Sequence, residues 1–340
     1  MNDQVTPTTV LEVTDLKTVF KTRDGEVHAV NGVSFSVATG ELLGVVGESG
    51  SGKSVTMMSL LKLLPSPPAE IVEGSVRFEG RDVLSMDDEE MRALRGGDIG
   101  FVFQDPMTSL NPVFTVGFQL VEALREHLKI KKKEARKRAA ELLATVGIAQ
   151  PEQRLKDYPH QFSGGMRQRV MIAMALACQP KVLIADEPTT ALDVTIQAQI
   201  LELIRELRND KGMGIIWITH DLGVVAGIAD RVIVMYGGQI VEHAKVADLF
   251  KNPQHPYTRA LLATIPSVDA TRSDRLHSIA GQPPSLARQP VSCPFAPRCE
   301  HAFDRCLEEN PPIAAVADGH DVACWLTRNE FGRIELRGNF

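Results

Sequence analysis

Apolar residues recur along this chain in two spacings, one typical of strands and one typical of helices. Residues 10–13 and 33–37 have strand periodicity, and the Asp-Gly pair at 24–25 between them is typical of a tight turn. Helical composition occupies residues 55–64 and 115–157. Four short apolar runs predict strands buried in a core, namely residues 41–46, 99–103, 182–185 and 214–219. Strands that alternate with helices predict an α/β fold.

Residues 47–54, with the sequence GESGSGKS, fit the phosphate-loop pattern G-x-x-x-x-G-K-[ST] at every fixed position. They lie between a predicted strand and a predicted helix, a context that separates a phosphate loop from an ordinary glycine-rich turn. Glycines let backbone N–H groups converge on phosphate oxygens, and the helix that follows presents the positive end of its dipole. Lys53 adds a charge for the β- and γ-phosphates, and the Ser54 hydroxyl can bind Mg²⁺. The predicted phosphate-binding residues are Gly47, Glu48, Ser49, Gly50, Ser51, Gly52, Lys53 and Ser54.

Polar residues stand at the ends of three predicted strands. Asp186 and Glu187 end one of them, and a buried strand does not carry paired acids without a use. We expect Asp186 to hold Mg²⁺ and Glu187 to orient or deprotonate an attacking water. Gln104 ends a second strand and could reach the cation or that water, although a glutamine in isolation is more often a turn residue. His220 ends a third strand and is a candidate for a γ-phosphate contact.

Five further residues, in three places along the chain, are candidates for contacts with a nucleotide. Ser163 suits the N-cap of a helix, and Gly164 and Gly165 after it leave backbone N–H groups open to an anion. Asp193 follows shortly after the paired acids. Phe20 lies in the strand region before the phosphate loop, where an aromatic ring either stacks on adenine or fills a core. Its position alone favours neither role.

Bulk properties limit the classes of function. The chain has 340 residues, enough for two units, and its net charge of −6 argues against nucleic-acid binding by the whole surface. Residues 1–7 lack the basic and apolar regions of a secretory signal. The longest clear apolar run, residues 170–178, is far shorter than the roughly 20 residues that cross a membrane. We therefore expect a soluble, cytoplasmic protein whose association with a membrane needs a partner.

Residues 251–340 differ from the rest in composition, because they hold 10 of the 20 prolines and four of the five cysteines. The four are spaced C-x5-C-x6-C-x17-C and are Cys293, Cys299, Cys306 and Cys324. Four thiolates in so short a segment suit zinc or an iron–sulfur cluster, and free or disulfide-bonded thiols are the alternative. Cys178 lies in an apolar stretch and is most simply a buried core thiol.

Taken in order, these motifs resemble those of the ATP-binding subunit of ABC transporters. Phe20 matches the aromatic A-loop position, while Met166 stands where the family signature most often has glutamine. The resemblance implies a P-loop NTPase (RecA-like) ATPase core at residues 8–255, with an antiparallel β subdomain and a helical signature subdomain at about 105–178. Beyond the phosphate loop, the matching residues are Gln104 of the Q-loop, Ser163, Gly164 and Gly165 of the signature, the Walker B acids Asp186 and Glu187, Asp193 of the D-loop and the switch histidine His220.

The resemblance also implies a dimer that encloses two ATP molecules head to tail. Each ATP would lie between Lys53 of one subunit and Ser163 of the other. Glu187, His220 and Gln104 would then be catalytic, and Mg²⁺ would be bound by Ser54, Gln104 and Asp186.

Residues 104–112, 158–160 and 255–258 narrow the resemblance to the ATPases of oligopeptide and dipeptide importers, a group that includes nickel importers. This implies a Pro/Cys-rich C-terminal domain at 256–340 that holds a [4Fe–4S] cluster on the four cysteines, with zinc as the alternative. The implied partners are a second, often different, ATPase subunit, two integral membrane permease subunits and, indirectly, an external substrate-binding protein. The implied location is peripheral, on the cytoplasmic face of the inner membrane.

Two alternatives to peptide import remain. Nickel is the alternative cargo, because the cargo is selected by proteins other than this one. A soluble ABC-type ATPase that acts on nucleic acid is the alternative class. It usually needs two cassettes in one chain, a long coiled coil or a basic linker, whereas this chain has one cassette and an acidic balance. Transport is therefore favoured.

Overall fold

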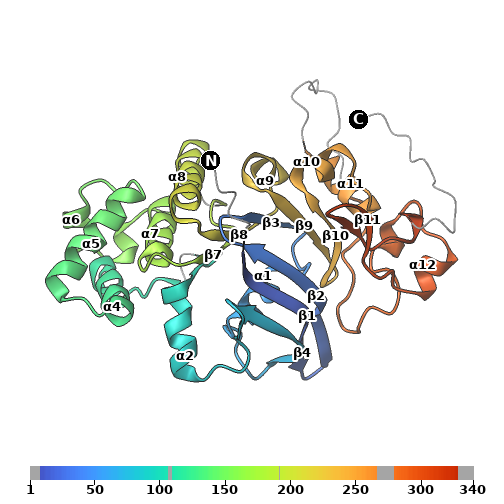
Figure 1. Ribbon diagram of the computed structural model, residues 1–340, viewed down its shortest axis with the longest axis horizontal. Helices are drawn as coiled ribbons and strands as arrows, with labels where there is room; N and C mark the ends of the chain where they lie inside the picture. Colours follow the sequence, from blue (N-terminus) through green and yellow to red (C-terminus); the bar gives the residue numbers. More distant parts are fainter. Residues whose placement is uncertain (1–7, 106–108, 191, 266–278, 328–340) are drawn as a thin grey trace. The chain divides into compact units, whose positions relative to one another are not determined.

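The computed structural model describes residues 8–105, 109–190, 192–265 and 279–327. The chain forms two compact units, each assembled from several segments. Both combine helices with strands (Figure 1), so the predicted α/β class is confirmed. Unit 1 consists of Met1–Glu12, Ser36–Leu43 and Val76–Thr219, and unit 2 consists of Val13–Phe35, Gly44–Ser75 and His220–Phe340.

A sheet in the order β3-β8-β7-β6 is the frame of unit 1, which contains Leu42 and Leu43 of β3. Strands β6, β7 and β8 run parallel, and β3, β7 and β8 are buried along their whole length. Parallel strands covered on both faces read as continuous apolar runs, which is why the sequence predicts them well. The bounds are β3 (Leu42–Val46), β6 (Ile99–Val102), β7 (Val182–Asp186) and β8 (Gly214–Thr219).

The predicted helical stretch at 115–157 is divided into separate helices. Lys129 ends α4 and Gln150 precedes α6, both in the left-handed conformation that helices do not continue through. In unit 1, α5 packs against both α4 and α7 (Figure 1). The helices are α2 (Asp88–Ala93), the π-helical turn η1 (Leu94–Asp98), α4 (Val116–Leu128), α5 (Lys132–Thr145), α6 (Pro151–Arg154), the 3₁₀ turn η2 (Pro159–Gln161), α7 (Gly164–Leu176) and α8 (Val194–Lys211).

The second half of β3 belongs to unit 2, where the strands of the sheet have the order β11-β12-β10-β9-β3. Here β9, β10, β12 and β11 pair antiparallel. A separate sheet has the order β2-β1-β4, and β5 pairs antiparallel with the last residues of β4 in unit 1. The strands are β1 (Thr9–Thr22), β2 (Gly25–Ala38), β4 (Ala69–Phe78), β5 (Arg81–Asp82), β9 (Arg231–Tyr236), β10 (Gln239–Lys245), β11 (Ala314–Ala317) and β12 (His320–Val322).

The core of unit 2 includes residues from the predicted C-terminal domain. Tyr257 and Phe295 pack in one apolar cluster with Val46 and Tyr236. The predicted boundary at 255/256 remains a prediction. In the described ranges, no helix combines the length and the apolar composition needed to cross a membrane. The helices of unit 2 are α1 (Lys53–Leu60), α9 (Leu222–Ile228), α10 (Val246–Lys251), α11 (Pro256–Leu262), the 3₁₀ turn η3 (Ala296–Arg298), α12 (Asp304–Glu308) and the 3₁₀ turn η4 (Trp325–Thr327).

Candidate nucleotide site

The phosphate loop connects β3 to α1 in unit 2, as the sequence predicts. Gly47 has φ of 153° and Gly52, the N-cap of α1, has φ of 97°, a region that favours glycine. A Cβ on Gly47 would lie 2.3 Å from the Met235 carbonyl oxygen, and a Cβ on Gly52 would lie 2.6 Å from that of Ala29. Both distances exclude a side chain, so the loop needs glycine at these positions. Gly52 has no side chain that could cap α1, and a bound anion would take the place of such a cap.

Lys53 is buried, and its ammonium group is held over the loop. Its Nζ donates to the carbonyl oxygens of Gly47 and Glu48, both at 2.8 Å, and to Ser51 Oγ at 3.3 Å. Neutral acceptors therefore position the charge before any phosphate arrives, and a phosphate would add ionic hydrogen bonds. Ser54 is half-buried in the first turn of α1, next to Lys53.

Two residues that the sequence reasoning missed hold Glu48 in place. The Glu48 N–H donates to the Tyr257 hydroxyl at 2.8 Å. The Glu48 carboxylate accepts two hydrogen bonds from the Arg298 guanidinium, at 2.6 and 3.0 Å. These partners lie 209 and 250 residues away along the chain. No pattern in the sequence links such distant positions, so only the fold could show them.

In unit 1, the two acids follow each other at the end of β7. Asp186 is buried, and Glu187 after it is half-buried with φ of 46°. This left-handed backbone is strained for a residue with a side chain, and such strain is often stored at functional sites. The Glu187 Oε2 atom accepts from Gln104 Nε2 at 3.3 Å and from Thr190 Oγ1 at 3.2 Å. The fold of unit 1 thus brings together two predicted residues, Gln104 and Glu187.

The predicted signature residues also form a helix terminus in unit 1. Ser163 is the N-cap of α7, and its Oγ accepts from the Met166 N–H at 3.3 Å, so the predicted cap is confirmed. A Cβ on Gly164 would meet nothing within 4 Å, so this chain by itself does not require glycine there. Asp193 is the N-cap of α8 and accepts from the Ile196 N–H at 3.0 Å.

The structure shows where His220 and Phe20 lie, but it does not test their predicted roles. His220 is exposed after β8, and Phe20 is half-buried in β1. Their contacts with a nucleotide remain predictions. Residues 106–108 of the motif at 104–112 lie outside the described residues, as do residues 266–278 and 328–340 of the predicted C-terminal domain.

The four C-terminal cysteines lie in unit 2 as free thiols. Burial, with a further contribution from the nearby thiols, raises the pKa of Cys293 to about 11 and that of Cys324 to about 12. Cys293, Cys299 and Cys306 all contribute to the shift of the Cys324 pKa, so the four lie within electrostatic range of one another. Among the described residues, no group of three or more ligands is arranged to hold a metal ion. Cys178 corrects the sequence reading, because it lies half-buried in the turn after α7 rather than in the core.

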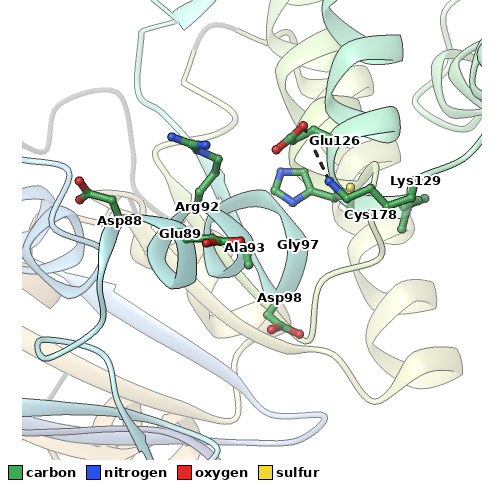
Figure 2. A pocket seen from close by; sticks show the side chains of 11 residues that line it. Asp88, Glu89, Arg92, Ala93, Gly97, Asp98, Glu126, Lys129 and Cys178 are labelled. Carbon is green, nitrogen blue, oxygen red and sulfur yellow. Dashed lines mark ion pairs between the residues drawn. The ribbon is translucent and has the colours of Figure 1, made fainter.

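A hollow of about 620 Å³ in unit 1 carries Cys178 in its wall (Figure 2). It lies beside α2, η1 and the end of α4, and its wall mixes acidic and basic side chains. Glu126 and Lys129 form an ion pair there at 3.9 Å. None of the predicted nucleotide-binding residues lines this hollow.

Comparisons with known proteins agree with these motifs. The family model "ABC transporter" matches residues 30–190, and the model "Oligopeptide/dipeptide transporter, C-terminal region" matches residues 241–306. The oligopeptide transport ATP-binding protein OppD of Bacillus subtilis (strain 168) is 53% identical over 96% of this chain and 92% of its own length. The dipeptide transport ATP-binding protein DppD of the same organism is 53% identical over 97% of this chain and 98% of its own.

Solved structures show the same fold. A dimeric, post-hydrolysis state of the ATP-binding cassette MJ0796 bound to ADP and Pi is similar with a TM-score of 0.64 and 29% sequence identity. The match covers 69% of this chain and 98% of that cassette.

Proposed function

The chain belongs to the family of ABC transporter ATP-binding proteins and is an ATP-hydrolysing transporter subunit, and from this premise we propose that it powers the uptake of di- or oligopeptides. The C-terminal region is the observation that supports peptides as the cargo. Residues 241–306 match the region typical of oligopeptide and dipeptide transporters, on the same chain as the cassette. Two relatives that are 53% identical over nearly the whole chain are named for oligopeptide and dipeptide transport.

In this proposal each side chain has a defined part in hydrolysis. Lys53 binds the β- and γ-phosphates, and Ser54 and Asp186 hold Mg²⁺. Glu187 takes the proton of the attacking water, and Gln104, which donates to Glu187 at 3.3 Å, keeps that carboxylate in position and can reach the metal. His220 contacts the γ-phosphate, and Phe20 stacks on adenine.

The second half of each site comes from a partner ATPase subunit, arranged head to tail. Three observations support this. Ser163 is exposed at the N-terminus of α7, where N–H groups and the helix dipole favour an anion. Gly164 has open space around it, so its lack of a side chain serves something other than this chain. A similar cassette is known as a dimer in a post-hydrolysis state. In the proposed dimer, Gly165 and Asp193 lie at the same partner-facing edge.

The permease contacts an exposed apolar patch at the start of α4 in unit 1. Val113 is 70% exposed, Phe114 43% and Phe118 48%. The two phenylalanine rings stack with centroids 4.6 Å apart. Grouped aromatic side chains in water mark an interaction surface rather than a core. Docking of two permease subunits on such patches would keep this ATPase peripheral, on the cytoplasmic face of the inner membrane.

The four C-terminal cysteines hold a [4Fe–4S] cluster, with one structural zinc as the alternative. The support for this proposal is the placement of four cysteines on one short segment and the influence of neighbouring thiols on the pKa values of Cys293 and Cys324. When bound, the cluster would supply iron–sulfur bonds that pin a proline-rich segment. Binding to iron would also favour the thiolate form of Cys293, which burial of this side chain disfavours.

Reconstitution tests the cargo. The chain is placed in liposomes with its partner ATPase, both permease subunits and the external binding protein, and uptake of a labelled tripeptide and of labelled Ni²⁺ is compared. ATP-dependent tripeptide uptake that a Glu187→Gln chain cannot support is the expected result. Uptake of Ni²⁺ without tripeptide would overturn the peptide assignment and leave the ATPase assignment standing.

A further inference from the structure

An ion pair ties the phosphate loop to the cysteine-rich segment within unit 2. The Arg298 guanidinium and the Glu48 carboxylate form two parallel hydrogen bonds, at 2.6 and 3.0 Å. The Arg298 side chain is only 5% exposed and that of Glu48 24%. A bidentate pair shielded from water in this way is stronger and more directional than a surface salt bridge.

Arg298 is itself held from several directions. Its Nε donates to the Ala280 carbonyl oxygen at 2.8 Å, and Nη2 donates to that of Ile279 at 3.1 Å. Its Nη1 donates to the Tyr236 hydroxyl at 3.1 Å. A side chain with this many fixed partners loses little further freedom when it binds Glu48, so it can fix the position of that residue.

Every polar group of Glu48 is engaged by a fixed partner. Its N–H donates to the hydroxyl of Tyr257, a ring packed 4.5 Å from Tyr236. Its carbonyl oxygen accepts from Lys53 Nζ at 2.8 Å, and its carboxylate accepts from Arg298. The second residue of the phosphate loop is therefore fixed by its side chain as well as by its backbone.

We propose that Arg298 is a positioning residue for ATP binding, which holds Glu48 in place and neutralises its charge beside the phosphate site. Two physical effects act in the same direction. Loss of the guanidinium would free the loop, whose N–H groups must converge on the phosphates. It would also leave an unpaired carboxylate in a loop that receives a polyanion, and like charges at short range repel strongly when water is partly excluded. The inference rests on ATP binding by this chain and not on the cargo or the cluster.

The test uses the full chain and titration with a fluorescent ATP analogue. Arg298→Ala should weaken binding by about tenfold or more, because one partner of a shielded, hydrogen-bonded ion pair is lost. Arg298→Lys keeps the positive charge but cannot make the two parallel hydrogen bonds of a guanidinium. An intermediate loss of ATP affinity is therefore expected. Arg288→Ala, which removes the same charge from an exposed position of the same segment, should bind as the unchanged chain does.

A second substitution separates positioning from a general loss of structure. In the Arg298→Ala chain, adding Glu48→Gln removes the unpaired charge but leaves the loop without its positioning partner, so it should restore part of the affinity. The turnover number at saturating ATP should stay within about twofold in Arg298→Ala, since Arg298 does not touch the reacting atoms and its effect falls on KM. An unchanged affinity in both Arg298 variants would refute the proposal. So would a loss that Glu48→Gln leaves undiminished. If Arg298→Ala does not fold, the Arg298→Lys chain decides by the same two comparisons.

Discussion

Replacing Glu187 by glutamine should separate ATP binding from ATP hydrolysis. The two side chains have nearly the same size, and glutamine retains an oxygen that can accept from Gln104 Nε2 or Thr190 Oγ1, which now lie 3.3 and 3.2 Å from Glu187 Oε2. The strained backbone, with φ of 46°, is equally strained for both. The substitution therefore removes a proton acceptor and leaves the local structure in place.

The expected loss follows from the role of the carboxylate. A positioned general base contributes about 10²-fold or more to a hydrolytic rate, which corresponds to at least about 2.7 kcal/mol of activation free energy. The neutral amide of glutamine can orient a water molecule but cannot take its proton. The turnover number of Glu187→Gln should thus fall by about 10²-fold or more, while the Kd for ATP changes by less than about threefold.

Two measurements check this result. Phosphate release gives the turnover number, and gel filtration with ATP and Mg²⁺ shows whether the inactive chain accumulates as a dimer around unhydrolysed ATP. Thr190→Ala is the matched control, because it removes one hydrogen bond to Glu187 but no carboxylate, and should cost far less. Hydrolysis by Glu187→Gln at close to the normal rate would mean that the base lies elsewhere in the chain.

Three other predictions test the dimer, the thiols and the buried histidine. In a mixed dimer, Ser163→Arg on one chain should silence the site whose Lys53 belongs to the other chain; loss of only its own site would exclude the head-to-tail arrangement. Anaerobically purified protein should absorb broadly near about 400 nm and lose this band in Cys299→Ser while nucleotide binding persists, whereas colourless protein with one zinc would refute the cluster. Burial lowers the pKa of His255 to about 4. Between pH 6.5 and 4 the unfolded chain therefore binds a proton at this residue that the folded chain does not. The free energy of unfolding should fall as the pH drops through this range. His255→Asn keeps a side-chain acceptor at the N-cap of α11 and should flatten this slope in urea titrations; an equally steep slope would contradict the assignment.

The local parts of the candidate site could be predicted from the sequence. The phosphate loop is specified by glycines whose positive φ and close backbone neighbours admit no other residue, as at Gly47 and Gly52. The strands before the polar residues are continuous apolar runs, so the ends that carry Asp186 and Gln104 are evident. Ser163 could be identified as an N-cap because its residue type and the following helix are adjacent in sequence.

The parts that depend on distant contacts could not be predicted. Arg298 stands in a proline-rich stretch, and its residue type gives no sign that its partner is Glu48, 250 residues earlier. The hydroxyl of Tyr257 likewise acquires a role only because the fold brings it to the Glu48 N–H, 209 residues earlier in the chain. The left-handed backbone of Glu187 is also unpredictable, because nothing in the residue type favours it. Patterns with a helical or strand period report only neighbours along the chain.

The position of Arg298 suggests why cysteines surround it. The 3₁₀ turn that carries Arg298 lies between Cys293 and Cys299, in a segment with little regular structure. Two parallel hydrogen bonds form only if the planes of the guanidinium and the carboxylate are aligned. The backbone of the turn that carries Arg298 must therefore be fixed. Part of the fixing comes from Phe295, which is buried in the core of unit 2, and from the Arg298 N–H, which donates to the Phe295 carbonyl oxygen at 2.9 Å. Thiols on both sides of the turn would provide the rest if they are joined through a metal group. Loss of one thiol should therefore weaken the hold on the Glu48 carboxylate without abolishing it, whereas loss of the guanidinium removes that hold and leaves the backbone contacts of Glu48 with Tyr257 and Lys53.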